Sequence, residues 1–272
     1  MPNIINIEDI NIPELSVYTS LTEAQLKIDK NIFIAESVKV IKVALDKGLM
    51  PISFLMEQRQ IDGIGKELIT RCPDVPVYTA PRQILSKLTG FELTRGVLCA
   101  MKRPKTATLN DVIKAAKRIA VLERLSDSAN VGAIFRSAAA LGIDAVLLFH
   151  NCSEPLNRRT VRVSMGSVFL VPWTFFAKND FPEPQNAVEF LKSNGYTTAA
   201  MALEDNSIGI DNPILNNSEK LALFFGSEGE GLSEETIKTC DYTVKIPMSH
   251  DVDSLNVAAA AAVTFWQLRP NK

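Results

Sequence analysis

LALFFGSEGEGLSEE, residues 221–235, joins an apolar run to a glycine-rich turn and then to the start of a helix. Glycine lets a backbone adopt positive φ or approach a ligand closely, and the turn holds Gly226, Gly229 and Gly231. Glu228 and Glu230 lie between these glycines and would repel a phosphate, and the lysine of a phosphate-binding loop is missing. Taken alone, the turn fits either a ligand cradle or a structural link between a buried strand and a helix.

The sequence around this turn alternates between short β-rich runs and helical segments. The expected strands are RIAVLERL, DAVLLFH, SVFLVPWTFF, YTTAAMAL, LALFFG and YTVKIPM, and the expected helices are ANVGAIFRSAAALG, PQNAVEFLKSNG, SEETIKTC and SLNVAAAAAVTFWQL. Short apolar runs separated by helices indicate a mostly parallel sheet covered on both faces. We therefore predict an α/β domain over residues 115–272.

The first hundred residues show the same alternation on a smaller scale. AESVKVIKVALDKG (35–48) has apolar residues at helical spacing and ends at Gly48. The further expected strands are PISFLME, VPVYTA and GVLCAM, and the further expected helices are IGKELITRC and PRQILSKLTG. We predict a small α/β domain over residues 1–103, with the polar, aperiodic segment 104–114 as a linker.

Length and composition bound the function. A chain of 272 residues can form two ordinary domains, and 46% apolar with 22% charged residues is typical of soluble globular proteins. Apolar runs are too short to span a bilayer and the N-terminus lacks a signal-peptide pattern, so we expect a cytoplasmic protein without membrane association. Four single cysteines and two histidines give no grouped ligands, which predicts neither disulfide nor metal site.

The net charge of −2 argues against a chain coated in positive charge. Local basic clusters are nevertheless present at KRPK (102–105), KAAKR (114–118) and NRRTVR (157–162). Each cluster fits a solvated surface, and together they fit local patches that hold nucleic acid.

A second informative stretch is VLERLSDSANVGAIFRSAAALG (121–142), where a strand again gives way to a helix. Arg136 sits in an otherwise apolar helix, and a guanidinium in such a place usually has a dedicated anionic or polar partner. The alternative is a surface arginine behind an ordinary N-cap. Ligands of open α/β sheets bind beyond the carboxyl ends of strands, which favours a functional role.

The third stretch is VKIPMSHDVDSLNVAAAAAVTFW (244–266). One interpretation places Ser254 at the N-cap of an alanine-rich helix, with Asn256 in the first turn. Because His250, Asp251 and Asp253 precede the serine, a hydrolytic site is an alternative. The absence of a G-x-S-x-G elbow and the crowding on one loop argue against it.

Together, NVGAIFRSA, FFGSEGEGL and IPM followed after five residues by SLNVAAAAA resemble the three motifs of the SpoU (TrmH-type) family of RNA ribose 2′-O-methyltransferases, within the SPOUT superfamily. Order and spacing match across residues 117–268. NRRTVRVSMGSVFLVPW (157–173) resembles the segment between the first two motifs. FIAESVKVIKVAL and TGFELTRGVLCAMKRP resemble the ribosomal-protein-like RNA-binding domain that precedes the motifs. Two departures are Ser37, where the family usually has glycine, and Ala258, where it often has serine.

The resemblance implies methyl transfer from S-adenosylmethionine to a ribose 2′-hydroxyl of structured RNA, ribosomal rather than transfer RNA. It also implies a deep trefoil knot in the C-terminal domain and a homodimer. The implied catalytic residues are Asn130, Arg136, Glu228, Ser254 and Asn256. The implied cofactor-binding residues are Ala202, Gly226, Ile246, Met248 and Leu255. RNA is expected to contact Arg95, Arg158, Arg159 and Arg162.

Several alternatives stay open at this point. The RNA could be transfer RNA, or the chain could be a catalytically silent RNA-binding member of the fold. A nucleotide-dependent dehydrogenase is disfavoured, because its glycine-rich turn would follow the first strand rather than come late. The sequence leaves open the modified nucleotide and the choice between housekeeping and antibiotic resistance. It also leaves open whether Arg136 is a base or an electrostatic stabiliser.

Overall fold

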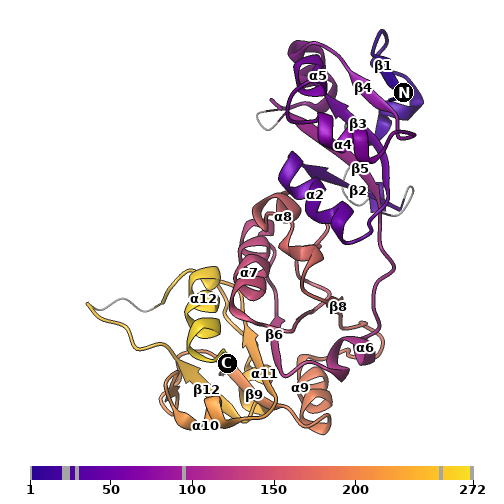
Figure 1. Cartoon of the computed structure of the whole chain (residues 1–272). Coiled ribbons are helices and arrows are strands. Elements are labelled where there is room, and N and C mark those ends of the chain that lie inside the picture. Colours follow the sequence, from indigo (N-terminus) through magenta and orange to yellow (C-terminus); the bar gives the residue numbers. More distant parts are fainter. Residues whose placement is uncertain (1, 20–24, 28–30, 94–95, 251–253, 270–272) are drawn as a thin grey trace. The chain divides into compact units, whose positions relative to one another are not determined.

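The computed structural model describes residues 2–19, 25–27, 31–93, 96–250 and 254–269. Its contacts separate two compact units, the first formed by Met1–Lys105 with Leu156–Phe169 and the second by Thr106–Pro155 with Leu170–Lys272. Figure 1 shows the elements of each unit along the chain. The segment Leu156–Phe169, which we had expected in the second domain, therefore has its contacts with the first unit.

The second unit is built on a seven-stranded sheet. Its strands are β6 (Arg118–Leu122), β7 (Ala145–Leu148), β8 (Trp173–Phe175), β9 (Thr197–Met201), β10 (Ile208–Gly209), β11 (Leu221–Phe225) and β12 (Tyr242–Lys245). Their order across the sheet is β10-β12-β9-β11-β6-β7-β8, and every described pairing is parallel. This confirms the predicted parallel α/β fold.

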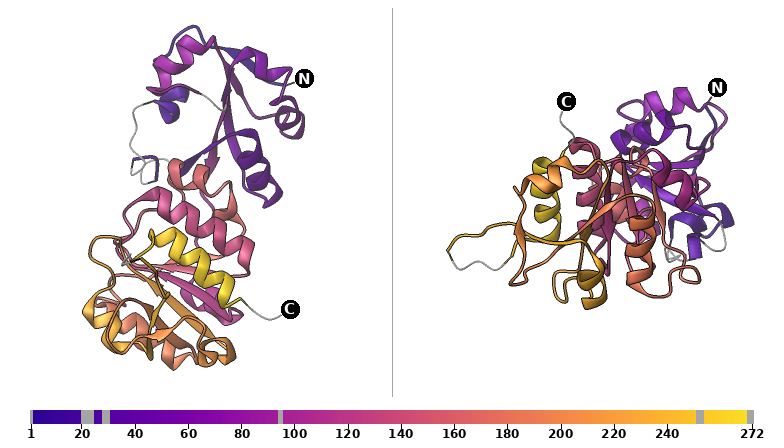
Figure 2. Two further views of the ribbon diagram at one scale, coloured as in Figure 1. Left: turned by 90° about the vertical axis from the view of Figure 1, so that its left-hand side faces the viewer. Right: turned by 90° about the horizontal axis from the view of Figure 1, so that it is seen from below.

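Alternate side chains of each strand point to opposite faces of this sheet, and those of the central strands are buried on both faces. Helices cover both faces. The helices of the unit are α6 (Leu109–Lys114), α7 (Ser128–Leu141), α9 (Pro184–Ser193), α10 (Pro213–Asn217), α11 (Glu234–Thr239) and α12 (Val257–Gln267). Ile119 and Val121 pack into one core with residues of α6, α9 and α11. On the other face, the ring of Phe225 lies 5.6 Å from that of Phe265 in α12. Figure 2 shows α7 and α12 side by side, in agreement with their contacts.

The first unit has a mixed five-stranded sheet. Its elements are β1 (Ile4–Asn6), η1 (Pro13–Tyr18), β2 (Ile32–Glu36), α2 (Val38–Asp46), β3 (Pro51–Met56), α3 (Gln58–Ile61), α4 (Lys66–Arg71), β4 (Val77–Thr79), α5 (Arg82–Thr89), β5 (Val97–Lys102), α8 (Arg158–Val163) and η2 (Ser167–Phe169). The strand order is β1-β4-β3-β5-β2, with β5 antiparallel to both of its neighbours. Phe169 of η2 packs on Phe33 of β2 with 5.6 Å between ring centroids, which ties the late segment to this unit.

Several expected element boundaries were wrong. The helix expected over 35–48 begins at Val38, because the two residues before Ser37 complete β2. Ser37 has a φ of 85°, a conformation that favours glycine, which accounts for the family's usual residue there. The expected linker 104–114 contains α6, whose Val112 and Ile113 are buried.

The stretch 167–176 was expected to form one strand but holds η2 and the short strand β8. Val168 and Phe176 are both buried, so its apolar character reports burial rather than strand pairing. The preceding helix α8 has only six residues and was not expected.

Arg118, at the start of β6, fixes the end of α12. Its guanidinium is buried and donates hydrogen bonds to backbone carbonyls of Leu268, Glu219, Asn216 and Lys117. Burial lowers the pKa of this guanidinium from its usual value, although four carbonyl acceptors still suit the charged form. The carboxyl end of α12 is thereby joined to the central strands, while its amino end reaches the site described below.

Candidate functional site

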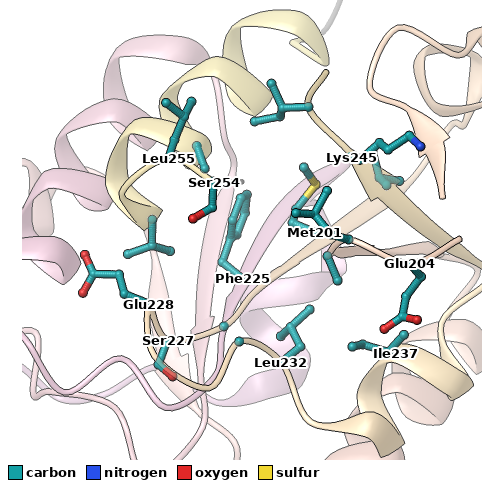
Figure 3. A pocket seen from close by; sticks show the side chains of 18 of the residues that line it. Met201, Glu204, Phe225, Ser227, Glu228, Leu232, Ile237, Lys245, Ser254 and Leu255 are labelled. Carbon is teal, nitrogen blue, oxygen red and sulfur yellow. The ribbon is translucent and has the colours of Figure 1, made fainter. Parts of the chain in front are cut away.

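A cavity of about 340 Å³ opens at the carboxyl ends of three adjacent strands, β9, β11 and β12. The residues that follow these strands form its wall, and the two residues Ser254 and Leu255 before α12 complete it (Figure 3). This is the place where open α/β sheets bind ligands, and the volume is within the usual range for small-molecule sites.

All five residues expected to bind the cofactor lie on this wall: Ala202, Gly226, Ile246, Met248 and Leu255. Among the described residues, none accepts a hydrogen bond from the backbone N–H of Ile246, Met248 or Leu255. These groups are available to a ligand, which suits recognition by backbone atoms. Their role in binding stays a prediction.

The glycine loop, residues 226–233, forms one side of the cavity. A Cβ on Gly226 would lie 2.1 Å from the carbonyl carbon of Gly231, so only glycine fits at this position. Gly231 has a φ of 68° and donates its N–H to the carbonyl of Ser227 at 2.9 Å. Gly229, in contrast, has open space around it. The loop is therefore folded tightly upon itself at its base and is open at its tip.

Three of the expected catalytic side chains form one hydrogen-bonded cluster beside the cavity. Asn130 Nδ2 donates to Glu228 Oε1 at 2.9 Å, and Asn256 Nδ2 donates to Asn130 Oδ1 at 3.1 Å. Asn256 Nδ2 also donates to Glu228 Oε1. Each of the three residues comes from a different motif, so the fold brings together segments up to 126 residues apart.

Asn256, rather than Ser254, is the N-cap of α12, because its Oδ1 accepts the N–H of Ala258 at 3.0 Å. The alternative interpretation of Ser254 as the cap of this helix was wrong. Ser254 instead lines the cavity near Glu228 (Figure 3). The cap leaves the amide nitrogen of Asn256 free to bond the other two members of the cluster.

Arg136 does not join this cluster. It is exposed on α7, has no hydrogen-bond or ion-pair partner in the described part of the chain, and does not line the cavity. The anionic or polar partner expected from its apolar surroundings is therefore absent from the described residues of this subunit. Glu228, which could have paired with it, is bonded to the two asparagines instead.

The cavity is acidic. Glu204, Glu228 and Glu230 line it together with one basic side chain, Lys245, which lies with Glu204 away from Glu228 (Figure 3). Carboxylates without an excess of basic groups favour a cationic ligand over a phosphate. Apolar lining residues such as Met201, Phe225 and Leu203 supply surface for a flat or aliphatic group.

Two residues that contact the wall of the cavity escaped the sequence analysis. Glu123 and Arg124 follow β6 and bond to the glycine loop, as detailed below. The sequence did contain a signal for them, because two charged residues directly follow the apolar run of a central strand. A charge that is buried at such a place needs a partner, which would have pointed to a contact with another segment. Lys245 and Glu204 were likewise missed, since nothing in their local sequence distinguishes them from surface charges.

Of the arginines expected to contact RNA, Arg95 lies outside the described residues. The guanidinium of Arg158 stacks on Phe91 at 3.8 Å, and Arg162 lies 3.6 Å from the buried carboxylate of Glu36. Arg159 is exposed. Arg158 and Arg162 thus have structural partners within the first unit, and RNA contact stays a prediction for all four arginines.

The site gives little support to a hydrolytic serine, a nucleophilic thiol or a metal. The loop acids Asp251 and Asp253 lie outside the described residues, and neither His250 nor Ser254 hydrogen-bonds a described residue. Burial raises the pKa of the Cys152 thiol to about 11, so it stays protonated at neutral pH and is a poor nucleophile. The described ranges hold no group of three side chains suited to a metal and no helix able to cross a membrane.

Comparison with known proteins shows which proteins resemble this chain in sequence and in fold. An uncharacterized tRNA/rRNA methyltransferase of Mycobacterium tuberculosis is 35% identical over 274 residues, covering 98% of this chain and 93% of that protein. The 23S rRNA (guanosine(2553)-2′-O)-methyltransferase RlmP of Bacillus subtilis is 29% identical over 218 residues, covering 76% of this chain and 82% of its own length. The AdoMet-bound rRNA methyltransferase from Sinorhizobium meliloti has the same fold, with a TM-score of 0.81, 23% identity and coverage of 98% and 97%.

The family described as the SpoU rRNA Methylase family matches residues 117–266, a range that contains all three motifs, the cavity and the Asn130–Glu228–Asn256 cluster. The match covers more than half of the chain. The chain therefore belongs to the SpoU rRNA methylase family.

Proposed function

We propose that the chain transfers a methyl group from S-adenosylmethionine to a ribose 2′-hydroxyl of RNA. The observation that carries this proposal is the convergence of Asn130, Glu228 and Asn256 beside an acidic cavity at the ends of β9, β11 and β12. Transfer of a labelled methyl group to RNA by the purified chain tests it. A protein that binds RNA but not S-adenosylmethionine would instead be a silent member of the fold.

The cavity fits this cofactor in size, charge and donor set. S-adenosylmethionine supplies an electrophilic methyl group on a cationic sulfonium, and it carries no phosphate. The N–H groups of Ile246, Met248 and Leu255, which bond no described residue, can bond the polar atoms of an adenosyl group. The carboxylates of Glu204, Glu228 and Glu230 match the positive charge.

The cluster can orient the ribose hydroxyl. Glu228 Oε1 accepts both amide hydrogens that reach it, whereas its Oε2 accepts from no described residue. We assign this second oxygen to the hydrogen of the 2′-hydroxyl, with the two asparagines holding the carboxylate in place. Fixing the acceptor in line with the methyl group is the main contribution a protein makes to such a displacement.

We propose that Arg136 acts across a homodimer. It is exposed and without a described partner on α7. Helix α12, which packs against α7, carries Val263 and Trp266, which are 41% and 57% exposed. Exposed apolar side chains on one helix and a cation without a described partner on its neighbour fit contact with a second copy. There the guanidinium would stabilise the charge that develops on the ribose oxygen or hold the adjacent phosphate.

We propose ribosomal RNA as the substrate rather than transfer RNA. The similarity to the 23S rRNA methyltransferase RlmP spans 218 residues, which is longer than the family-matched range 117–266 and thus reaches into the first unit. This unit resembles the RNA-binding domain of members that modify ribosomal RNA. The proposed location is the cytoplasm, and the trefoil knot remains a prediction from family membership.

The first unit offers a basic groove for this RNA. It lies between α2 and the start of α4, has a volume of about 680 Å³, and is lined by Val38, Lys39, Lys42, Gly63, Ile64, Lys66 and Glu67. Lys42 pairs with Glu67, but the ammonium groups of Lys39 and Lys66 have no partner among the described residues. Free cations beside an exposed aliphatic side chain suit a phosphodiester backbone better than the engaged Arg158 and Arg162.

Replacing both free lysines, Lys39→Glu with Lys66→Glu, is expected to weaken RNA binding without changing cofactor affinity. Losing two phosphate contacts should reduce the slope of log K against log salt by about 1.4 to 1.8. Filter binding at several salt concentrations measures this slope. Lys87→Glu with Lys178→Glu makes the same charge change on exposed lysines outside the groove and outside the basic clusters, and is the control. Equal losses from both double variants would show a general charge effect and remove the groove from the account.

A further inference from the structure

The two residues directly after β6 contact the glycine loop from behind. Glu123 is almost fully buried, and its Oε1 accepts the N–H of Ser233 at 3.0 Å. Its Oε2 accepts the hydroxyl hydrogen of Thr236 at 2.6 Å. Since Ser233 is the N-cap of α11, this single carboxylate fixes the point where the loop ends and the helix begins.

Arg124 contacts the loop nearer its tip. One terminal nitrogen donates to Glu230 Oε2 at 2.9 Å, and the other donates to the carbonyl oxygen of Gly231 at 3.2 Å. Its Nε lies 3.6 Å from Glu123 Oε1. The two neighbouring side chains therefore form one charged network that holds the loop at both Gly231 and Ser233. Hydrogen bonds of a charged donor with fixed geometry are the stronger kind.

The atoms that Arg124 holds are part of the cavity wall. Gly231 lies against Gly226 so closely that a Cβ on Gly226 would lie 2.2 Å from the Gly231 carbonyl oxygen, which is the atom that Arg124 bonds. Gly226, Glu228, Glu230 and Gly231 all line the cavity. Movement of Gly231 would thus change the shape of the proposed cofactor site, although Arg124 itself does not line it.

We propose that Arg124 is a positioning residue for cofactor binding, acting as a clamp that holds the glycine loop against the cavity. The identity of the ligand rests on the proposed function, while the clamp itself is a property of the loop. Without the guanidinium, Gly231 and Glu230 both lose the side chain that holds them to the end of β6. The loop then samples open conformations, and binding must first close it.

Arg124→Gly in the full chain tests the clamp, because Arg124 has a φ of 59° and glycine removes the side chain without straining the backbone. Two readouts are needed. Hydrogen exchange of the ligand-free protein should show the amides of Glu230 and Gly231 exchanging about tenfold faster. Titration should show S-adenosylmethionine binding about tenfold more weakly, with kcat at saturating cofactor changed less than about twofold.

The matched control is Arg82→Ala, which breaks another exposed arginine–glutamate pair, that with Glu92, in the first unit. It should leave both readouts unchanged. Unchanged exchange in Arg124→Gly would overturn the clamp, whether or not the chain binds S-adenosylmethionine. Faster exchange with unchanged cofactor affinity would overturn the positioning role. If the parent chain binds no S-adenosylmethionine, the proposed function fails, while the exchange data still decide the clamp.

Discussion

Replacing Gly226 by alanine is expected to weaken S-adenosylmethionine binding about 10- to 100-fold. The added Cβ would lie 2.1 Å from the carbonyl carbon of Gly231 and 2.2 Å from the backbone nitrogen of Leu232. Both contacts are backbone atoms that cannot rotate away, so the loop must move. Overpacking of this kind costs about 1–3 kcal/mol, which corresponds to that range of affinity. Isothermal titration of the two proteins with S-adenosylmethionine measures the change.

Gly229→Ala is the matched control for this substitution. Gly229 lies in the same loop, but a Cβ there meets nothing within 4 Å and its φ is not positive. The control should bind the cofactor as the parent does. Equal weakening by both variants would mean that the loop tolerates no side chain anywhere, and equal binding by both would mean that the Gly226–Gly231 contact does not shape the cofactor site.

Arg136→Ala is expected to reduce methyl transfer about 100- to 1,000-fold while cofactor affinity stays within about twofold of the parent. The reason is positional: Arg136 is exposed and does not line the cavity of its own subunit, so its loss leaves the proposed cofactor contacts intact. A cation that stabilises developing charge acts on the rate rather than on cofactor binding. Single-turnover transfer to RNA, together with titration, separates the two effects.

The proposed dimer gives this prediction a second test by complementation. At a cofactor concentration far below the Kd of Gly226→Ala, this variant and Arg136→Ala are each nearly inactive, but a mixed dimer would combine the arginine of one subunit with the cofactor site of the other. Half of randomly paired dimers are mixed and each has one working site of two, so co-expression should restore about a quarter of the parental activity. No recovery from verified mixed dimers would place Arg136 in the same subunit as its cofactor site and contradict the proposed action across the dimer.

The sequence predicted the order of strands and helices around the site, because motif residues at strand ends of a parallel sheet must meet at one edge. Asn130, Glu228 and Asn256 were expected together and lie together. Their exact bonding was not predictable: the choice of Asn256 over Ser254 as the cap of α12 depends on the path of the preceding loop. Arg136 shows the limit more clearly, since it has no partner among the described residues, and local pattern does not report whether a second subunit supplies one.

Tertiary contacts account for the remaining differences. Val112 and Ile113 make α6 part of the core. A helix of six residues beside a proline-containing polar segment is too short to show a recognisable helical periodicity in the sequence. The segment 156–169 packs with the first unit through Phe169, and no local signal reports such a long-range choice. Arg124 was missed because its partners Glu230 and Gly231 are more than 100 residues away.

One measurement tests the central claim most directly. The purified chain is incubated with methyl-labelled S-adenosylmethionine and, separately, ribosomal and transfer RNA from cells that lack the gene, and the products are digested to nucleosides and analysed by mass spectrometry. The account predicts label on the ribose of one nucleoside of ribosomal RNA, at a linkage that has become resistant to alkali, and about 100- to 1,000-fold slower labelling with Arg136→Ala. Label on a base, or no label in either RNA although the chain binds S-adenosylmethionine, would contradict it.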